Sequence, residues 1–334
     1  DAVESVARKL LDTLSEPLTF DGTQFHIGGT IGISHGPEDS DDPDQLLGMA
    51  DTAMYRIKHS GGGNYGFASA EMALISRQRM DIETGLRHAL RHGELAMFYQ
   101  PQFQIGTGAL HGFEALIRWN RPGHGMVSPG IFIPVAEESD LIMELDAWVL
   151  DEVARQIRQW RDEGLAAAPV AVNISARQCQ SDKLTAQVAA TLQKHAIPAR
   201  LLELEITETA AMSDSEHVET LLKGFEALGV SVALDDFGTG YSSLTHLRRF
   251  PISILKIDQS FVAEAIRNKD DAAIIGAIVA LAHNLGLKVI GEGVETKAQL
   301  EFLASHACDI AQGYLVGRPE PAAVVRQLLM PLNN

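Results

Sequence analysis

The sequence predicts an α/β fold, a modified TIM (β/α)₈ barrel with an antiparallel first strand, preceded by a small partial α+β segment. From about residue 88, short apolar runs rich in β-branched residues alternate with segments of helical periodicity. Runs that are apolar on both faces and alternate with helices are typical of a parallel sheet covered by helices. Eight such runs over about 240 residues favour a closed barrel over an open sheet.

The first two runs are joined only by a short turn around residues 106–108, so we expect them to pair as an antiparallel hairpin. The later runs are separated by longer segments that can hold a helix, as parallel neighbours require. In chain order, the predicted strands are 95–103, 111–119, 169–175, 201–208, 231–237, 254–258, 288–294 and 310–316.

Apolar residues spaced by three and four predict helices over 142–160 and 274–285, each followed by a glycine that ends it. Capping-box spacing marks a helix start directly after a strand, as a β-to-α connection requires. Two pairs have this spacing, Ser213 with Glu216 and Thr296 with Gln299.

The N-terminal part has a different pattern of predicted helices and strands from the rest of the chain. Residues 1–68 predict a helix with leucines at 10–14, a hairpin with its turn at 21–22, and a helix over 46–57. So few apolar residues make a marginal core, so we expect this piece to belong to a larger domain. Residues 69–93 predict a connecting helix that leads into a barrel over residues 80–330.

Composition excludes several classes of protein. With 46% hydrophobic and 21% charged residues in 334, the chain is globular, and its longest apolar run, 272–282, is too short to cross a bilayer. Cys179 and Cys308 are solitary, and no export signal is visible, so we expect a reducing, cytoplasmic location. A formal net charge of −17 argues against binding DNA, RNA or an anionic membrane. An anionic ligand would need a local cation.

Polar or ionisable residues end every predicted strand from the second to the eighth. A lone carboxylate at a strand end is usually a loop residue or a helix cap. In a barrel, however, these ends converge on one face, and so many carboxylates cannot stay ionised together without compensation. The residues are Glu114, Asn173, Glu205, Glu208, Asp235, Asp236, Lys256, Asp258, Glu292, Glu295 and Gln312.

Oxygen ligands without cysteine or a convincing histidine suit hard divalent cations such as Mg²⁺ or Mn²⁺. The number of carboxylates favours two ions, and the adjacent Asp235 and Asp236 could reach neighbouring ones. Two such ions clamp the attacking and leaving oxygens of a phosphoester, so phosphoester hydrolysis is the favoured reaction. We expect a mobile loop after this pair, within the segment DDFGTGYSSL (235–244), although an ordinary turn would have a similar composition.

Three residues have both a functional and a structural interpretation. Lys256 could orient a water or stabilise phosphoryl charge, or it could be a structural ion-pair partner. Glu292, flanked by two glycines, could be a ligand, a general base or a turn residue. Arg118 could bind a phosphate or pair with a surface carboxylate.

Seven segments together resemble the EAL-domain family of cyclic di-GMP phosphodiesterases over about residues 80–330. They are GFEALIRW, VNIS, LEITE, LDDFGTGYSSL, LKIDQSF, GEGVE and QGYLVGRP. The resemblance implies a modified β/α barrel that opens cyclic di-GMP to linear pGpG with two Mg²⁺ or Mn²⁺ ions. It also implies a homodimer formed through the EAL domain.

The resemblance implies a role for each matching residue. Metal ligands would be Glu114, Asn173, Glu205, Asp235, Asp236 and Glu292. Catalytic roles would fall to Glu292 as the base, Lys256 positioning the water and Glu208 anchoring the DDFGTG loop. Substrate contacts would be Arg118, Leu116 and Gln100, and the supporting shell Asp258, Glu295 and Gln312.

Residues 1–68, especially TIGIS and LLGMADTAMYRIKHSGGGNYGF, resemble the C-terminal half of a GGDEF diguanylate cyclase domain. The GGDEF loop itself is missing from the sequence, so this piece should not synthesise cyclic di-GMP. The resemblance implies a fragment of a tandem GGDEF-EAL protein, whose upstream sensory regions could attach the parent to a membrane.

Two alternatives to an active phosphodiesterase stay open. The chain could be a catalytically silent receptor for cyclic di-GMP, or a barrel enzyme that acts on another phosphoester. The sequence also leaves open whether Glu203, two residues before Glu205 on the same strand face, lies inside the barrel.

Overall fold

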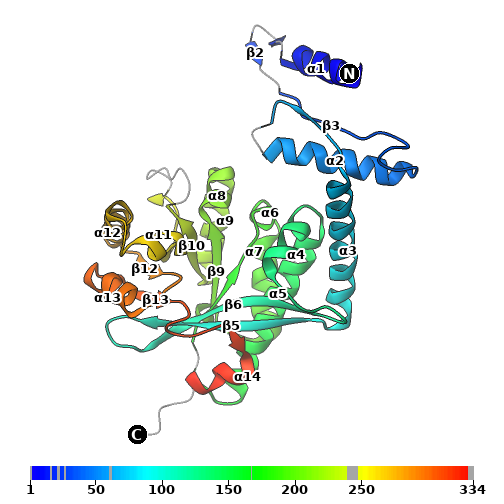
Figure 1. Ribbon diagram of the computed structural model, residues 1–334. Coiled ribbons are helices and arrows are strands. Elements are labelled where there is room, and N and C mark those ends of the chain that lie inside the picture. Colours follow the sequence, from blue (N-terminus) through cyan, green and yellow to red (C-terminus); the bar gives the residue numbers. More distant parts are fainter. Residues whose placement is uncertain are drawn as a thin grey trace. The chain divides into compact units, whose positions relative to one another are not determined.

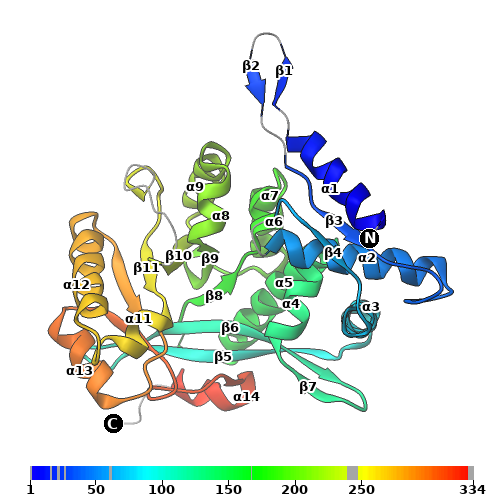
Figure 2. The ribbon, with the colours of Figure 1, turned by 45° about the horizontal axis from the view of Figure 1, so that its top comes forward.

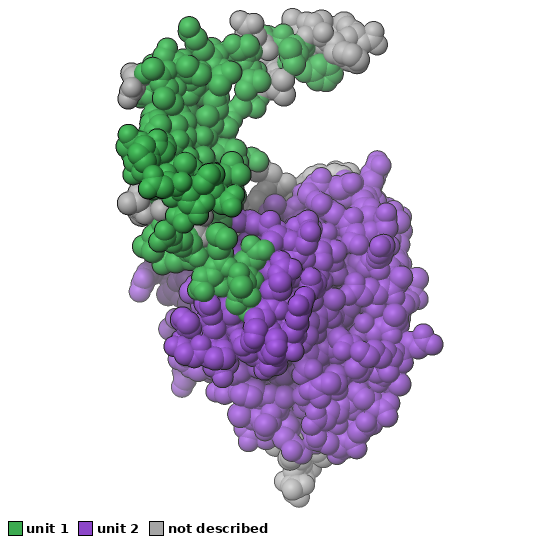
Figure 3. Space-filling view, turned by 90° about the vertical axis from the view of Figure 1, so that its right-hand side faces the viewer, with its two compact units in different colours: residues 1–86 green, residues 87–334 purple. Residues whose placement is uncertain are grey.

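The computed structural model describes residues 2–15, 17–20, 23–25, 28–59, 62–166, 168–238 and 247–329. The chain forms two compact units, residues 1–86 and 87–334 (Figure 3). Within the described residues, no helix has both the length and the apolar character that a membrane span requires.

The first unit has the α+β composition that the sequence predicts. Its strands form two pairs, β1 with β2 antiparallel and β3 with β4 parallel. The turn of the predicted hairpin, residues 21–22, lies outside the described residues. In order, the elements are α1 (Ala2–Ser15), β1 (Leu18–Phe20), β2 (Thr23–Phe25), β3 (Ile31–Ile33), α2 (Pro43–His59), β4 (Tyr65–Phe67) and α3 (Ala70–His92), the last of which continues into the second unit.

The second unit is a closed barrel with helices on its outside (Figures 1 and 2). All eight predicted strands are present, and β5 is antiparallel to both of its barrel neighbours, β6 and β13, as expected for the first strand. The barrel strands are β5 (Leu95–Gln104), β6 (Leu110–Arg121), β8 (Val170–Asn173), β9 (Leu202–Thr207), β10 (Ser231–Phe237), β11 (Ile254–Ile257), β12 (Lys288–Gly291) and β13 (Ile310–Gln312).

Two short strands extend the sheet beyond the barrel, β7 (Gly125–Val127) beside β6 and β14 (Glu320–Pro321) beside β5. The helices follow the strands along the chain. They are α4 (Pro129–Glu137), α5 (Leu141–Asp162), α6 (Ala176–Cys179), α7 (Leu184–His195), α8 (Glu208–Ser213), α9 (Ser215–Leu228), α11 (Gln259–Glu264), α12 (Lys269–Asn284), α13 (Lys297–Ser305) and α14 (Ala322–Val325).

One of the two predicted helix caps is correct and one is wrong. Thr296 and Gln299 form a capping box at the start of α13. Ser213 instead ends α8, with its hydroxyl donating to the Ala210 carbonyl. Asp214 caps α9, because the short helix α8 already occupies the residues directly after β9.

The barrel interior has an apolar centre. Ala233, Ile254, Ile290 and Ile310, one from each of four successive strands, form a buried cluster there. Because side chains alternate along a strand, the next inward residue toward each C-terminal end is polar or charged. The apolar cluster therefore separates the two ends of the barrel, which differ in charge.

Candidate active site

A pocket of about 360 Å³ opens where the C-terminal ends of the barrel strands meet. Such ends converge on one face of a β/α barrel, which is why residues distant in sequence come together here. The pocket is lined by both acidic and amide side chains. They include Gln100, Glu114, Asp235, Glu292, Glu295 and Gln312.

Lys256 lies at the centre of the acidic side chains and has no solvent exposure. Its ammonium group contacts carboxylates from several strands at once. The Nζ atom lies 2.7 Å from Glu205 Oε2, 2.8 Å from Glu292 Oε1, 3.0 Å from Asp235 Oδ2 and 3.9 Å from Glu114 Oε2. We call these five residues the Lys256 cluster.

The Lys256 cluster holds four carboxyl groups and one ammonium group, so its acidic groups outnumber its single positive group. Burial favours the neutral amine, but the surrounding carboxylates raise the pKa of Lys256 well above its ordinary value. Burial also raises the pKa of Glu205 well above its usual range, and that of Glu292 to about 8, despite the attraction of Lys256. Full ionisation at neutral pH therefore requires additional cations.

The donor atoms present suit a hard divalent cation. Glu205 Oε1 is buried and has no hydrogen-bond partner among the described residues, which is costly unless another group binds it. Asp235, Asp236 and Glu292 each offer a carboxylate oxygen, and these three atoms lie within 4.8 Å of one another. Asp236 is held in the left-handed region, at a φ of 56°, which turns its side chain away from the alternation of β10.

Amide side chains orient Glu114. Asn173 Nδ2 donates to Glu114 Oε1 at 2.7 Å, and Gln312 Nε2 donates to Glu114 Oε2. The same Gln312 nitrogen also reaches Gln100 Oε1 at 3.2 Å, and Gln102 donates to Gln312 Oε1 at 2.8 Å. This chain of amides, which the sequence did not reveal in full, fixes the carboxylate of Glu114 at the pocket.

Glu208 is buried at the start of α8, directly after β9. Its Oε2 accepts a hydrogen bond of 2.9 Å from the backbone N–H of Gly238, directly after the Asp235–Asp236 pair. Glu208 therefore holds the first residue of the glycine-rich loop. The rest of that loop, residues 239–246, for which we predicted mobility, lies outside the described residues.

The other predicted site residues lie around this centre. Asp258 caps α11, with Oδ1 accepting from the Ser260 N–H at 3.0 Å. The guanidinium of Arg118 lies 5.5 Å from the centre of the Phe98 ring, on the strand face that it shares with Leu116 and Glu114.

Two features of the site were missed or left open by the sequence. Glu203 is buried in the barrel, 4% exposed, as its alternation with Glu205 allowed. Tyr314 lines the pocket, is half exposed, and carries the Arg318 guanidinium 4.4 Å from its ring centre. Its exposure beside a pocket was not readable from the sequence, although it lies within the segment QGYLVGRP.

Each of the two parts of this chain matches a known protein family. The EAL domain family matches residues 83–319, and the diguanylate cyclase GGDEF domain family matches residues 1–64. The chain belongs to the EAL domain family. A partial GGDEF segment precedes its EAL barrel.

Two curated relatives of this EAL domain chain come from Pseudomonas aeruginosa. The bifunctional diguanylate cyclase/cyclic di-GMP phosphodiesterase MucR is 42% identical over 95% of this chain and 46% of its own length. The cyclic di-GMP phosphodiesterase NbdA is 38% identical over 97% of this chain and 41% of its own length. The chain thus spans less than half of these relatives.

A solved structure of the PaMucR phosphodiesterase in complex with c-di-GMP is similar to the EAL domain. It is 46% identical, has a TM-score of 0.71, and covers 73% of this chain and 99% of that one. The barrel and its antiparallel strand are therefore those of the EAL family.

Proposed function

We propose that this EAL domain hydrolyses cyclic di-GMP to linear pGpG with two divalent cations, Mg²⁺ or Mn²⁺. The observation that carries the proposal is the Lys256 cluster, four carboxyl groups around one buried lysine at the C-terminal face of the barrel. The substrate is supported by the names of MucR and NbdA and by the c-di-GMP complex of the PaMucR phosphodiesterase.

The proposed metal ligands share oxygen donors and a place at the pocket. The free oxygen of Glu205 and the three mutually close carboxylates support this assignment. When bound, the cations would lower the pKa of a bound water and stabilise negative charge on the phosphoryl oxygens. The proposed ligands are Glu114, Asn173, Glu205, Asp235, Asp236 and Glu292.

The chain's own residues would orient the water and move its proton. Lys256 Nζ, held by Glu205 and Asp235, has a fixed position from which it can donate to the attacking water. Glu292, whose Oε1 lies 2.8 Å from Lys256 Nζ, can accept the proton that the water loses when its carboxyl group is ionised. The water oxygen bonds to phosphorus, one ester P–O bond breaks, and the leaving ribose oxygen gains a proton.

Substrate contacts would come from the rim of the pocket. Arg118 shares its face of β6 with Glu114 and can bind a phosphate, and Leu116 and Gln100 line the acidic pocket. Glu208 would hold the loop at Gly238, while Asp258, Glu295 and Gln312 would support the site from outside. Each of these roles is a proposal that substitution can test.

The test is a turnover assay with Mn²⁺ or Mg²⁺, in which pGpG is separated by chromatography. We expect a chelator to abolish turnover, and Glu292→Gln and Lys256→Ala each to lower it by about 10² to 10⁴-fold. Glu301→Gln, an exposed glutamate on α13, is the matched control and should retain activity. Retained turnover in both active-site variants would refute the assigned roles.

The same assay separates the enzyme from the silent receptor. Binding of cyclic di-GMP in Mg²⁺ without any pGpG after prolonged incubation would favour the receptor. Competition with mononucleotides and sugar phosphates would reveal another phosphoester substrate. The homodimer that the family resemblance implies remains a prediction, which sedimentation analysis of the chain can test.

A further inference from the structure

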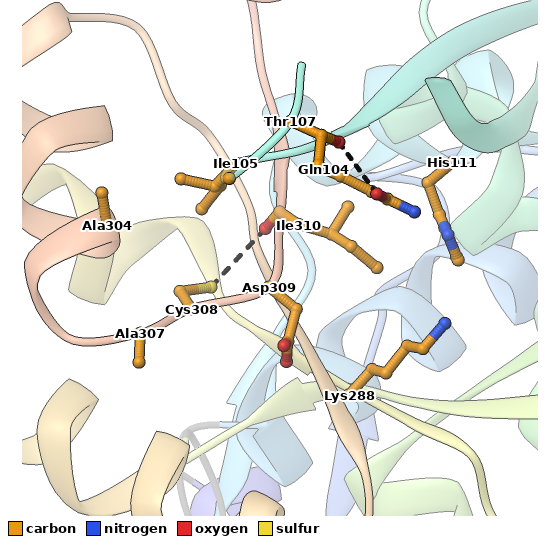
Figure 4. A pocket seen from close by; sticks show the side chains of 11 residues that line it. Gln104, Ile105, Thr107, His111, Lys288, Ala304, Ala307, Cys308, Asp309 and Ile310 are labelled. Carbon is orange, nitrogen blue, oxygen red and sulfur yellow. Dashed lines mark hydrogen bonds between the residues drawn. The ribbon is translucent and has the colours of Figure 1, made fainter. Parts of the chain in front are cut away.

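A second cavity, of about 430 Å³, lies at the opposite end of the barrel from the proposed active site. Its wall includes the turn between β5 and β6, the first residues of β12 and β13, and the end of α13. Figure 4 shows the side chains that line it. A volume of this size is in the range of small-molecule sites.

One side of this cavity carries nitrogen donors without partners. Among the described residues, no carboxylate or other acceptor lies within bonding distance of Lys288 Nζ, and none accepts from Gln104 Nε2. The half-buried ring of His111 likewise makes no hydrogen bond within the described part of the chain. In Figure 4 the nitrogen ends of these three side chains lie on the same side of the cavity.

The positive charge of Lys288 influences the ionisation of His111 on this side of the cavity. Burial first, and then the positive charge of Lys288, lower the pKa of His111. The carboxylate of Asp309 also lines the cavity, but it lies beyond 4.0 Å from Lys288 Nζ. Its Oδ2 contacts the His283 ring at 2.9 Å and accepts from the Val289 N–H at 2.8 Å. The carboxyl group of Glu203, inside the barrel, interacts electrostatically with Lys288 but lies more than 4.0 Å from its Nζ atom.

The other side of the cavity is apolar. Its hydrocarbon comes from Ile105, Ala304, Ala307 and Ile310. The Cys308 thiol lies within hydrogen-bonding distance, 3.5 Å, of two backbone carbonyl oxygens. A ligand that fits both sides would place an anionic group against the nitrogen donors and a short hydrocarbon part against the alanines.

We propose that this cavity is a binding site for a small organic anion, a carboxylate or a phosphate ester with a short apolar body. Lys288 provides the charge, Gln104 and His111 provide further hydrogen bonds, and the Ala304 side accepts the hydrocarbon. The site is distinct from the acidic pocket, because the apolar cluster of Ile254 and Ile290 separates the two ends of the barrel. It rests on no assumption about the reaction at the other end.

The test is a ligand-observed NMR titration of the full chain with hexanoate and with butyl phosphate. A chelator is present throughout, so that no metal at the acidic pocket can bind the probes. We expect binding in the millimolar range or tighter, and at least about fivefold weaker binding of hexanamide, which is neutral and of similar shape. The tighter of the two anions identifies the preferred head group.

Two variants locate the site. Lys288→Met keeps the length of the side chain and should weaken anion binding by about tenfold. Lys297→Met, at an exposed position of α13, should change it by less than about twofold. Ala304→Trp places a large ring at an exposed helix position and should block the apolar side. It tests the site without altering its charge.

Several results would overturn the proposal. These are no detectable binding of either anion, equal binding of hexanoate and hexanamide, or unchanged binding in both Lys288→Met and Ala304→Trp. Circular dichroism of each variant establishes that it is folded before its affinity is compared.

Discussion

A lysine lies at each end of the barrel, Lys256 at one and Lys288 at the other, and the surroundings of these two lysines differ. At the C-terminal end, Lys256 is fully buried and contacts three carboxylates within 3.0 Å. At the N-terminal end, Lys288 is exposed and has no carboxylate within 4.0 Å among the described residues. At the first end the carboxyl groups outnumber the single ammonium group. At the second end, the Lys288 ammonium group is available to bind an anion.

This difference teaches that net charge is a poor guide to a site. The chain carries a formal charge of −17, yet among the described residues carboxylates lie within 4.0 Å of Lys256 and not of Lys288. The charge of the groups at each end of the barrel, rather than the net charge of the chain, determines which ions that end can bind. Exchanging one charged group at a time tests the comparison.

The largest effect is expected when the lysines themselves are replaced. Without divalent cations, Lys256→Met should lower the free energy of unfolding by about 3 to 5 kcal/mol, because it leaves several buried carboxyl groups uncompensated. Lys288→Met should change it by less than about 0.5 kcal/mol, because it removes an exposed, unpaired charge. Urea unfolding in a chelator measures both, and equal losses would contradict the comparison.

The next effect concerns two glutamates on one strand. Glu205→Gln removes a carboxylate oxygen that has no hydrogen-bond partner among the described residues, so we expect Mn²⁺ affinity to fall by about 10 to 100-fold. Glu203→Gln, two residues away on the same inner face, should leave that affinity within about twofold. The concentration dependence of thermal stabilisation by Mn²⁺ gives both affinities. Similar losses in the two variants would show that the cation site is not confined to the Lys256 cluster.

The sequence predicts the frame of this arrangement well, for physical reasons. Strands buried on both faces must be apolar throughout, so the eight runs were visible, and the short turn at 106–108 forced the antiparallel first pair. The charged residues at the strand ends were visible for the same reason, because Lys256 and Glu205 interrupt apolar runs.

The contacts themselves were not predictable. Which carboxylates reach Lys256 depends on the stagger of β9, β10 and β11, and periodicity does not specify stagger. The cap at Ser213 was wrong because nothing in the local pattern shows that β9 leads directly into the short helix α8. The cavity at Lys288 was invisible because its wall combines a turn, two strand starts and the end of a helix.

The smallest effect comes from a buried carboxyl group that has no ammonium group beside it in the described part of the chain. Asp146, on α5, is 8% exposed and accepts hydrogen bonds from the hydroxyl and the N–H of Ser175. Burial raises its pKa to about 6, despite these hydrogen bonds. Asp146 is therefore a buried carboxyl group whose pKa is raised mainly by burial, with no lysine to offset that effect among the described residues.

The direction in which Asp146 changes stability with pH follows from the pH at which the unfolded and the folded chain each lose its proton. The unfolded chain loses this proton near pH 4 and the folded chain near pH 6, so stability falls by about 2 to 3 kcal/mol as the pH rises between these values. Asp146→Asn keeps an oxygen for Ser175 and should be more stable than the parent above pH 6, by up to about 2 kcal/mol. At about pH 4 the two should be equal, which urea unfolding at both pH values measures.

Asp151, on the same helix, supplies a control of opposite sign. Burial acts against it, but hydrogen bonds from Lys194 and His195 lower the pKa of Asp151. Its contribution is therefore present at neutral pH and is lost as the pH falls through this lowered pKa. Asp151→Asn should destabilise the chain at neutral pH, by less than about 1 kcal/mol because the pair is partly exposed. If both variants shifted stability in the same direction at neutral pH, a neighbouring ammonium group would not be what distinguishes these carboxylates, and the contrast between the barrel ends would lose its electrostatic basis.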